Sequence, residues 1–210
     1  MNPIEAPPFP KQETAVILPE PSEFAEIHTE RLILRLLRVD NDEDAAGLFR
    51  VRSQQEVMDW MRLKAADTNP DDTKKWIRKK VLSPPGSPAD AGSRLFYFLV
   101  VEKDHNAVGS GGRIVGAAGV NSVYPAPAVG CMFHPEVWGK GYATEALRAV
   151  VTAWWNLPRA WCVEEEKLFA AVKPANMGSL RVLEKVGFQV YAYTHSPERL
   201  ALMSIKRPFT

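Results

Sequence analysis

Cysteine is scarce in this chain of 210 residues, which holds only Cys131 and Cys162. Two cysteines without C-x-x-C spacing exclude a disulfide framework. Long hydrophobic runs are missing as well: the longest, residues 95–101, is far shorter than the roughly 20 residues of a membrane span. The first residues hold no basic stretch followed by an apolar one, so we expect no secretory signal. These absences predict a cytoplasmic protein without a membrane partner.

An excess of charge of either sign is also absent. The sequence has 26 Lys+Arg against 25 Asp+Glu, a formal net charge of +1. Binding nucleic acid through phosphates needs clustered basic residues, so we expect no nucleic-acid partner. The histidines do not have the spacing of metal ligands, and we expect no metal. A hydrophobic content of 46% is ordinary for a globular domain, and this length can bury a sizeable core.

Proline marks the domain organisation. Six of the 17 prolines lie within the first 21 residues. Proline cannot donate a backbone hydrogen bond and biases its predecessor toward extended conformations. We therefore expect an irregular N-terminal arm over residues 1–26 and a single domain over 27–210. A second proline-rich stretch, residues 83–88, predicts a loop within that domain.

Hydrophobic patterning predicts strands interrupted by helices. Apolar runs of strand length cover residues 32–37, 95–101, 114–120, 129–133, 168–172, 189–194 and 201–206. Helical spacing covers residues 40–51, 54–61, 71–81, 142–155 and 176–186. This order is neither a regular strand–helix alternation nor a sandwich. It predicts a mixed α/β (α+β) sheet covered by helices.

A turn with two glycines leads directly into the strongest predicted helix. Gly139 and Gly141 follow the strand over residues 129–133 and precede the helix that starts at Tyr142. The first turn of a helix has backbone N–H groups without internal partners, and together with the helix dipole they favour phosphate binding. Neither the nucleoside-triphosphatase phosphate loop nor the dinucleotide fingerprint fits, each failing by one residue. A plain tight turn and a nucleotide-binding protein both remain open on this evidence.

The segment Trp138-Gly139-Lys140-Gly141-Tyr142-Ala143 resembles the [QR]-x-x-G-x-[GA] acyl-CoA loop of the GCN5-related N-acetyltransferase (GNAT) superfamily. Two other stretches, residues 28–35 and 176–188, are similar to motifs of its RimJ/RimL-type branch. The likeness spans residues 28–206. It implies the GNAT fold: a mixed, mostly antiparallel sheet of about six to seven strands, flanked by helices, with splayed middle strands.

The resemblance implies an acetyl-CoA-dependent N-acetyltransferase. Acetyl-CoA would be the co-substrate, and the acceptor would be a primary amine of a small molecule or a protein N-terminus. The enzyme would be a monomer or homodimer. The alternative is a non-catalytic acyl-CoA-binding protein, a sensor or pseudoenzyme, of the same fold. By resemblance, the cofactor-binding residues are Met132, Phe133, Trp138, Gly139, Lys140, Gly141, Tyr142, Ala143, Thr144, Asn176 and Ser179.

The sequence departs from the superfamily pattern at two positions. Trp138 stands where Gln or Arg usually opens the loop, which removes the usual side-chain donor. Leu183 stands where a tyrosine often protonates the leaving thiolate.

Four residues are candidates for catalysis. By resemblance, Ser179 lies near the CoA sulfur and could donate a proton, while Asn176 contacts the cofactor arm or simply caps its helix. Glu30 and His134 are candidate bases for the acceptor amine. Each has an ordinary alternative: Glu30 as an exposed charge beside Arg31, and His134 as a loop residue before a proline.

Overall fold

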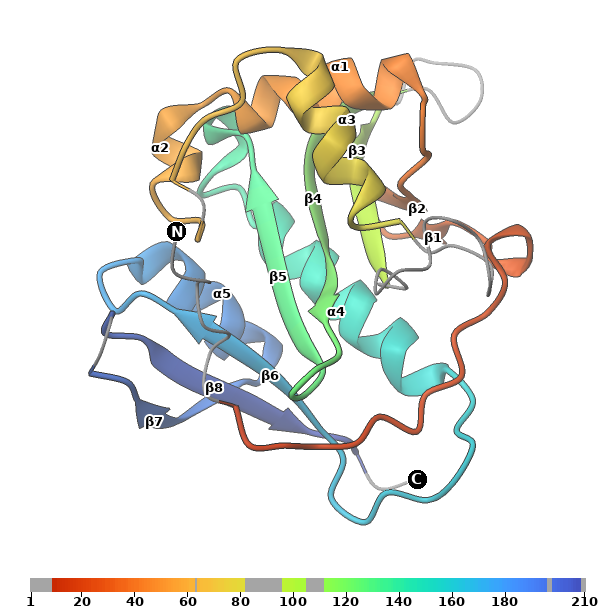
Figure 1. Ribbon diagram of the computed structural model, residues 1–210, viewed down its shortest axis with the longest axis vertical. Coiled ribbons are helices and arrows are strands. Elements are labelled where there is room, and N and C mark those ends of the chain that lie inside the picture. The colour runs from red at the N-terminus through yellow and green to blue at the C-terminus, as the bar shows by residue number, and fades with distance from the viewer. Residues whose placement is uncertain (1–8, 63, 82–95, 105–111, 196–197, 209–210) are drawn as a thin grey trace.

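The computed structural model describes residues 9–62, 64–81, 96–104, 112–195 and 198–208. These residues form one eight-stranded sheet in the order β1-β2-β3-β4-β5-β6-β8-β7 (Figure 1). The strands are β1 Ile27–His28, β2 Leu32–Leu36, β3 Tyr97–Lys103, β4 Gly112–Ser122, β5 Ala128–Phe133, β6 Lys167–Val172, β7 Gln189–Tyr193 and β8 Ala201–Lys206. All neighbours are antiparallel except β5 and β6. The predicted mixed, mostly antiparallel sheet is thus confirmed.

The sheet has one strand more than the pattern predicted. Strand β1 is two residues long and pairs Ile27 with Leu34 of β2, too short for any periodic signal. The predicted strand over residues 95–101 corresponds to β3, although residue 95 lies outside the described residues, as does the predicted loop over 83–88.

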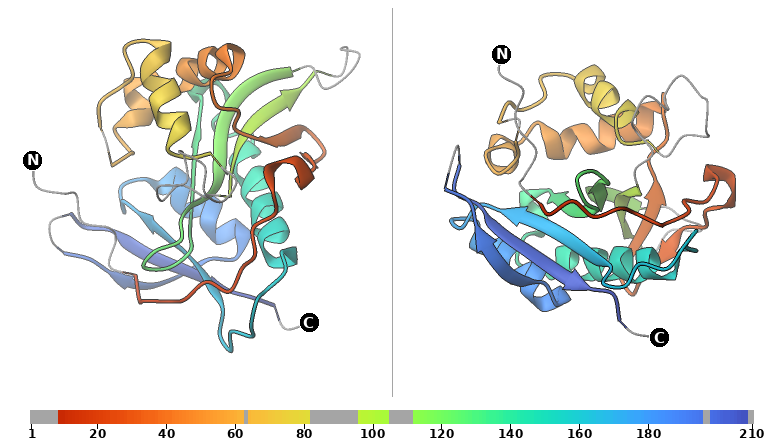
Figure 2. Two further views of the ribbon diagram at one scale, coloured as in Figure 1. Left: turned by 45° about the vertical axis from the view of Figure 1, so that its right-hand side comes forward. Right: turned by 60° about the horizontal axis from the view of Figure 1, so that its bottom comes forward.

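Helices cover both faces of the sheet. The helices α1 Asp42–Arg52, α2 Gln55–Met58 and α3 Pro70–Arg78 lie on one face, and α4 Tyr142–Asn156 and α5 Met177–Val186 on the other (Figure 2). Two short 3₁₀ turns, η1 Pro21–Glu23 and η3 Pro135–Val137, complete the described elements. None of the described helices is both long enough and apolar enough to span a bilayer.

The core fixes α4 against the sheet. Its buried stripe falls at helical spacing and packs against β2, β4 and β5. This stripe consists of Ala146, Leu147, Val150, Val151 and Trp154. A second cluster, including Leu48, Leu99 and Met132, fills the opposite face under α1 and α3. With both faces packed, the direction in which the first turn of α4 points is set by the core.

Strands β5 and β6 part soon after they meet. Their parallel pairing is confined to Ala128 and Phe169, where the Phe169 N–H donates to Pro127 O at 2.9 Å. Beyond this point the two strands diverge (Figure 1). We call this divergence the splay; it was predicted, and it opens toward the C-terminal ends of both strands. Helix α4 follows β5 and α5 follows β6, so both helices begin at the open end.

The described part of the N-terminal arm lies against the end of α4 and the start of β6. The Ile17 N–H donates to Pro158 O, and the Ala160 N–H donates to Ala15 O. The Gln12 side chain both donates to and accepts from the backbone of Lys167. These contacts hold residues 12–17 on the domain, remote from the open end of the splay.

Candidate active site

The glycine loop, residues 138–144, leaves the first turn of α4 without a side-chain cap. Gly139 and Gly141 have φ values of 75° and 85°, in the left-handed region that favours glycine. Gly141 is the N-cap of α4, and the first hydrogen bond of the helix runs from the Glu145 N–H to Gly141 O at 3.0 Å. The N–H groups of Tyr142, Ala143 and Thr144 therefore have no acceptor within the helix, and the helix dipole adds partial positive charge there.

The other long helices begin differently. Asn41 caps α1, Asn69 caps α3 and Asn176 caps α5, and in each case the asparagine side chain accepts an N–H from the residue three positions on. An asparagine cap satisfies one of the free donors of a helix start. Among the described α-helices of nine or more residues, only α4 lacks such a cap.

The register of β5 decides which of its backbone groups face the splay. The His134 N–H donates to Val115 O, and Met132 pairs with Ala117. Antiparallel pairs alternate, so the N–H and C=O of Met132 point toward β4 and those of Phe133 point toward the splay. Both residues were predicted to contact the cofactor arm, and the register leaves Phe133 as the one of the two whose amide faces the splay.

Trp138 does supply a side-chain donor, contrary to the expectation that this substitution removes one. The indole N–H donates to Phe133 O at 2.8 Å. Trp138 is nevertheless 46% exposed, so the ring lies at the surface beside the splay. The bond ties the start of the glycine loop to the last residue of β5.

Asn176 and Ser179 lie together at the start of α5, on the other side of the splay. The Ser179 N–H donates to Asn176 Oδ1 at 3.0 Å, which is the cap expected from the sequence. The cap uses the carbonyl oxygen of the asparagine and leaves its amide NH₂ group for another partner. Leu183, where a tyrosine often stands in the superfamily, is 5% exposed in the core.

The two candidate bases lie in different places. His134 follows β5 directly, and its Nδ1 accepts the Glu136 N–H at 3.3 Å as the cap of η3. The bond occupies the lone pair of Nδ1, and Glu136 Oε2 lies 3.6 Å from the same nitrogen. Glu30 lies in the turn between β1 and β2. Glu30 lines a cavity beside the start of α4 together with Gly141 and Thr144, and neither Phe133 nor Ser179 lines that cavity.

Charged side chains absent from the predicted set surround the glycine loop. The Tyr142 hydroxyl donates to Glu102 Oε1 at 2.6 Å, and Arg113 bridges Glu102 and Glu136. The Tyr142 hydrogen bond, helped by Arg113 and opposed by partial burial, lowers the pKa of the Glu102 carboxyl below its ordinary value. Lys140 is exposed. Tyr142 and Glu102 are 40 positions apart, on a helix and a strand, so no local pattern could reveal their contact.

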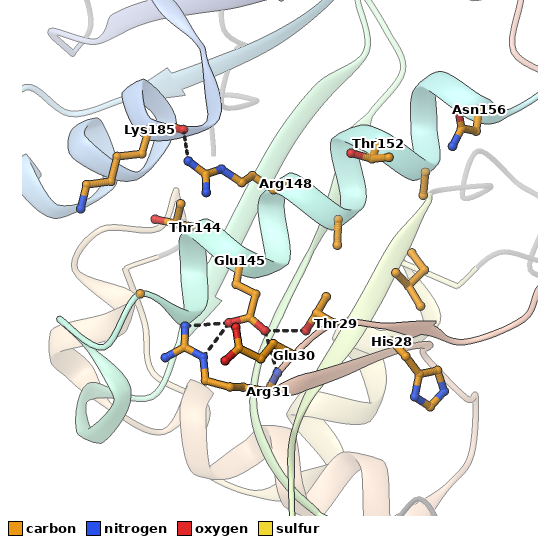
Figure 3. A pocket seen from close by; sticks show the side chains of 14 residues that line it. His28, Thr29, Glu30, Arg31, Thr144, Glu145, Arg148, Thr152, Asn156 and Lys185 are labelled. Atoms are coloured by element: carbon orange, nitrogen blue, oxygen red, sulfur yellow. Dashed lines mark hydrogen bonds and ion pairs between the residues drawn. The ribbon is translucent and has the colours of Figure 1, made fainter.

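A cavity of about 780 Å³ lies beside the loop, between the turn after β1 and the outer face of α4 (Figure 3). Gly141 and Thr144 line it at the start of α4, and Arg148 and Lys185 line it further along. Within the described ranges, no group of three or more His, Cys, Asp and Glu side chains could hold a metal ion.

Comparison with known proteins places this geometry in a family. A family model described as an acetyltransferase (GNAT) domain matches residues 31–189. No curated protein sequence matches the chain.

Solved structures match over nearly their whole length. A GNAT-family acetyltransferase from Bacillus anthracis is 20% identical with a TM-score of 0.61, covering 87% of this chain and 99% of that one. A putative ribosomal-protein-serine acetyltransferase from Vibrio cholerae is 20% identical with a TM-score of 0.58, covering 89% and 99%. AAC(6′)-Ib in complex with ribostamycin and coenzyme A is 19% identical with a TM-score of 0.59, covering 85% and 94%.

At these sequence identities the solved structures establish the fold alone. The family model matches residues 31–189, which include the glycine loop and the helices α4 and α5. The chain therefore belongs to the GNAT acetyltransferase family.

Proposed function

We propose that this protein is an acetyl-CoA-dependent N-acetyltransferase that transfers the acetyl group directly to a primary amine. The single observation that carries the proposal is the uncapped start of α4 at the open end of the splay. Three consecutive N–H groups, on Tyr142, Ala143 and Thr144, are left there for an acceptor outside the helix. A diphosphate is the part of acetyl-CoA that such a start binds best.

The rest of the site suits the remainder of the same molecule. The Phe133 N–H faces the splay, where an extended arm could lie alongside β5. Asn176 and Ser179 would face the arm from α5, and the spare NH₂ group of Asn176 would be a donor for it. The diphosphate would lie at residues 138–144, with Lys140 as an exposed cation nearby.

Acetyl-CoA would supply an activated acetyl group, and the residues of this chain would orient it. The Phe133 N–H is positioned as a donor to the thioester carbonyl oxygen, where negative charge develops during attack. Ser179 is the candidate donor of a proton to the departing thiolate. With Glu30 outside the splay and His134 Nδ1 occupied by a backbone N–H, the acceptor ammonium would lose its proton to ordered water or to another carboxylate acting as the base. Most of the rate enhancement would then come from positioning.

We place the protein in the RimJ/RimL-type branch on its motifs at residues 28–35 and 176–188. We further propose that it is a cytoplasmic monomer or homodimer. The neighbour from Vibrio cholerae is consistent with a protein acceptor, whereas AAC(6′)-Ib is bound to ribostamycin, a small-molecule acceptor class. Both classes offer a primary amine. The screen that tests the proposal should therefore hold aminoglycosides, polyamines, amino acids and N-terminal peptides.

One observation favours the alternative, a non-catalytic acyl-CoA-binding protein. The buried Leu183 cannot protonate a thiolate, so only Ser179 is left for that role among the predicted residues. Measuring thiol release from acetyl-CoA across the amine panel separates the two functions. Amine-dependent release supports the enzyme, whereas tight CoA binding without release for any amine supports the sensor.

A further inference from the structure

The turn between β1 and β2 reaches the first turn of α4 through one carboxylate. Glu145 Oε1 accepts the Thr29 hydroxyl at 2.6 Å and the Arg31 backbone N–H at 2.9 Å. Glu145 Oε2 accepts Arg31 Nε at 2.8 Å, and the second arm of the guanidinium lies 2.6 Å from the same oxygen (Figure 3). Four donors from one turn therefore converge on one side chain of α4.

Arg31 also contacts the glycine loop itself. Its NH1 donates to Lys140 O at 2.9 Å, and its guanidinium carbon lies 4.6 Å from the centroid of the Tyr142 ring. A Cβ added at Gly141 would lie 3.4 Å from Arg31 NH2. One side chain thus lies against three successive residues, those that form the left-handed turn into α4.

The ion pair between Arg31 and Glu145 is more buried than an ordinary surface ion pair and has more hydrogen bonds. The Glu145 side chain is 15% exposed and that of Arg31 is 38% exposed. Burial alone would raise the pKa of the Glu145 carboxyl, but the bonds from Thr29 and Arg31 outweigh it and hold this pKa below its ordinary value. The planar guanidinium contacts the carboxylate through Nε and NH2 and the Lys140 carbonyl through NH1, whereas an ammonium has a single nitrogen for both acceptors.

We propose that Arg31 is a positioning residue of the acetyl-CoA site: held by Glu145, it fixes the Lys140 carbonyl and the turn at Gly141, and thereby aims the N–H groups of Tyr142, Ala143 and Thr144. The inference rests on the proposed function, because it concerns the same diphosphate site. It gives a physical role to the Thr29-Glu30-Arg31 stretch, of which Thr29 and Arg31 bind Glu145 and Glu30 does not.

The first experiment measures the Kd of CoA by calorimetry for the wild type and for Arg31→Ala. We expect Arg31→Ala to weaken CoA binding about tenfold or more, because misplaced donors lose a large part of their binding strength. The matched control is Arg35→Ala, four residues further on in strand β2, since Arg35 makes a two-bond contact with Asp44 on the other face of the sheet. It should lose stability and keep the Kd of the wild type.

Two further variants separate geometry from charge. Arg31→Lys keeps the positive charge but cannot reach both acceptors, so we expect it to bind CoA nearly as weakly as Arg31→Ala. The double variant Arg31→Ala with Glu145→Gln removes the unpaired carboxylate that Arg31→Ala leaves beside the diphosphate. Weak binding should persist in the double variant, and the backbone amide resonances of Gly139 and Gly141 should shift in all three variants.

The outcomes are distinct. A wild type that does not bind CoA overturns the proposed function itself. A wild type that binds, with a folded Arg31→Ala of equal affinity, overturns the positioning role alone. Recovery of affinity in Arg31→Lys or in the double variant would mean that charge, and not the position of the loop, sets the affinity, and would also overturn it.

Discussion

The two helices that begin at the open end of the splay differ in how the backbone N–H groups of their first turns are treated. Helix α5 satisfies its own start, because Asn176 accepts the Ser179 N–H. Helix α4 begins with a glycine that caps nothing, and its first turn is held from outside by Arg31 and by the bond of Tyr142 to Glu102. A helix start with a side-chain cap has one of its free N–H groups satisfied within the protein. One that is held by neighbours keeps its N–H groups for a ligand.

We expect the largest effect on the start of α4 from a substitution at Gly141. Gly141→Val forces a β-branched residue into the left-handed region, which costs about 1–2 kcal/mol, or else moves the loop. We expect CoA affinity to fall about a hundredfold in a protein that still folds, because the displaced N–H groups would no longer point at the diphosphate. Calorimetry with CoA measures the loss.

Gly187 provides the control for this substitution. It also has a left-handed φ, 110°, but it caps the C-terminal end of α5. Gly187→Ala should lower the melting temperature without changing the Kd of CoA. Equal CoA affinity in Gly141→Val and the wild type would contradict the assignment of the loop.

The start of α5 is tested next, at Ser179. If Ser179 donates a proton to the thiolate, Ser179→Ala should lower kcat by about tenfold with little change in the KM for acetyl-CoA. Its backbone N–H, which the cap uses, is unaffected. A kcat equal to that of the wild type would remove Ser179 from the chemistry and leave water as the donor.

Replacing Asn176 should have a smaller effect, which is divided between the stability of the fold and the binding of acetyl-CoA. Asn176→Ala removes a cap, which costs about 1 kcal/mol of unfolding free energy. Asn69→Ala removes the equivalent cap of α3 and should cost a similar amount. Only Asn176→Ala should also raise the KM for acetyl-CoA, by a few-fold. If both variants leave this KM unchanged, Asn176 is a cap and nothing more.

The smallest predicted effect is on pH dependence. The first turn of α4 contains Glu145, whose pKa is lowered, whereas that of α5 contains no acid. The stabilisation from an acid with a lowered pKa is present above its unfolded pKa and is lost as the pH falls through the folded value. The protection factor of the Gly141 amide, in which the intrinsic slowing of exchange by acid is divided out, should therefore fall more on acidification than that of the Gly178 amide. Glu145→Gln should abolish the difference between the two amides. If the pH response at Gly141 is unchanged in this variant, Glu145 is not its cause.

The sequence predicts the elements that carry a long periodic signal. The apolar stripe of α4 predicts residues 142–155, and the structure has Tyr142–Asn156. Strand β1, with two residues, has no such signal. The glycine loop could be located because the requirement for glycine there is local, a left-handed turn before a helix.

The contacts that make the loop a site could not be predicted in this way. Arg31 and Glu145 are 114 positions apart, so only the packing of α4 on β2 brings them together. The choice of Phe133 over Met132 depends on the register between β4 and β5, which a single strand does not reveal. The indole bond of Trp138 joins residues only five positions apart, but its partner is a backbone carbonyl, which has no sequence signature of its own.

The most direct measurement is a crystal structure of the protein with CoA. The account predicts diphosphate oxygens about 3 Å from the backbone nitrogens of Tyr142, Ala143 and Thr144, with the arm extended beside Phe133. Diphosphate bound elsewhere on the molecule, or these three N–H groups directed at acceptors of the protein itself, would contradict it.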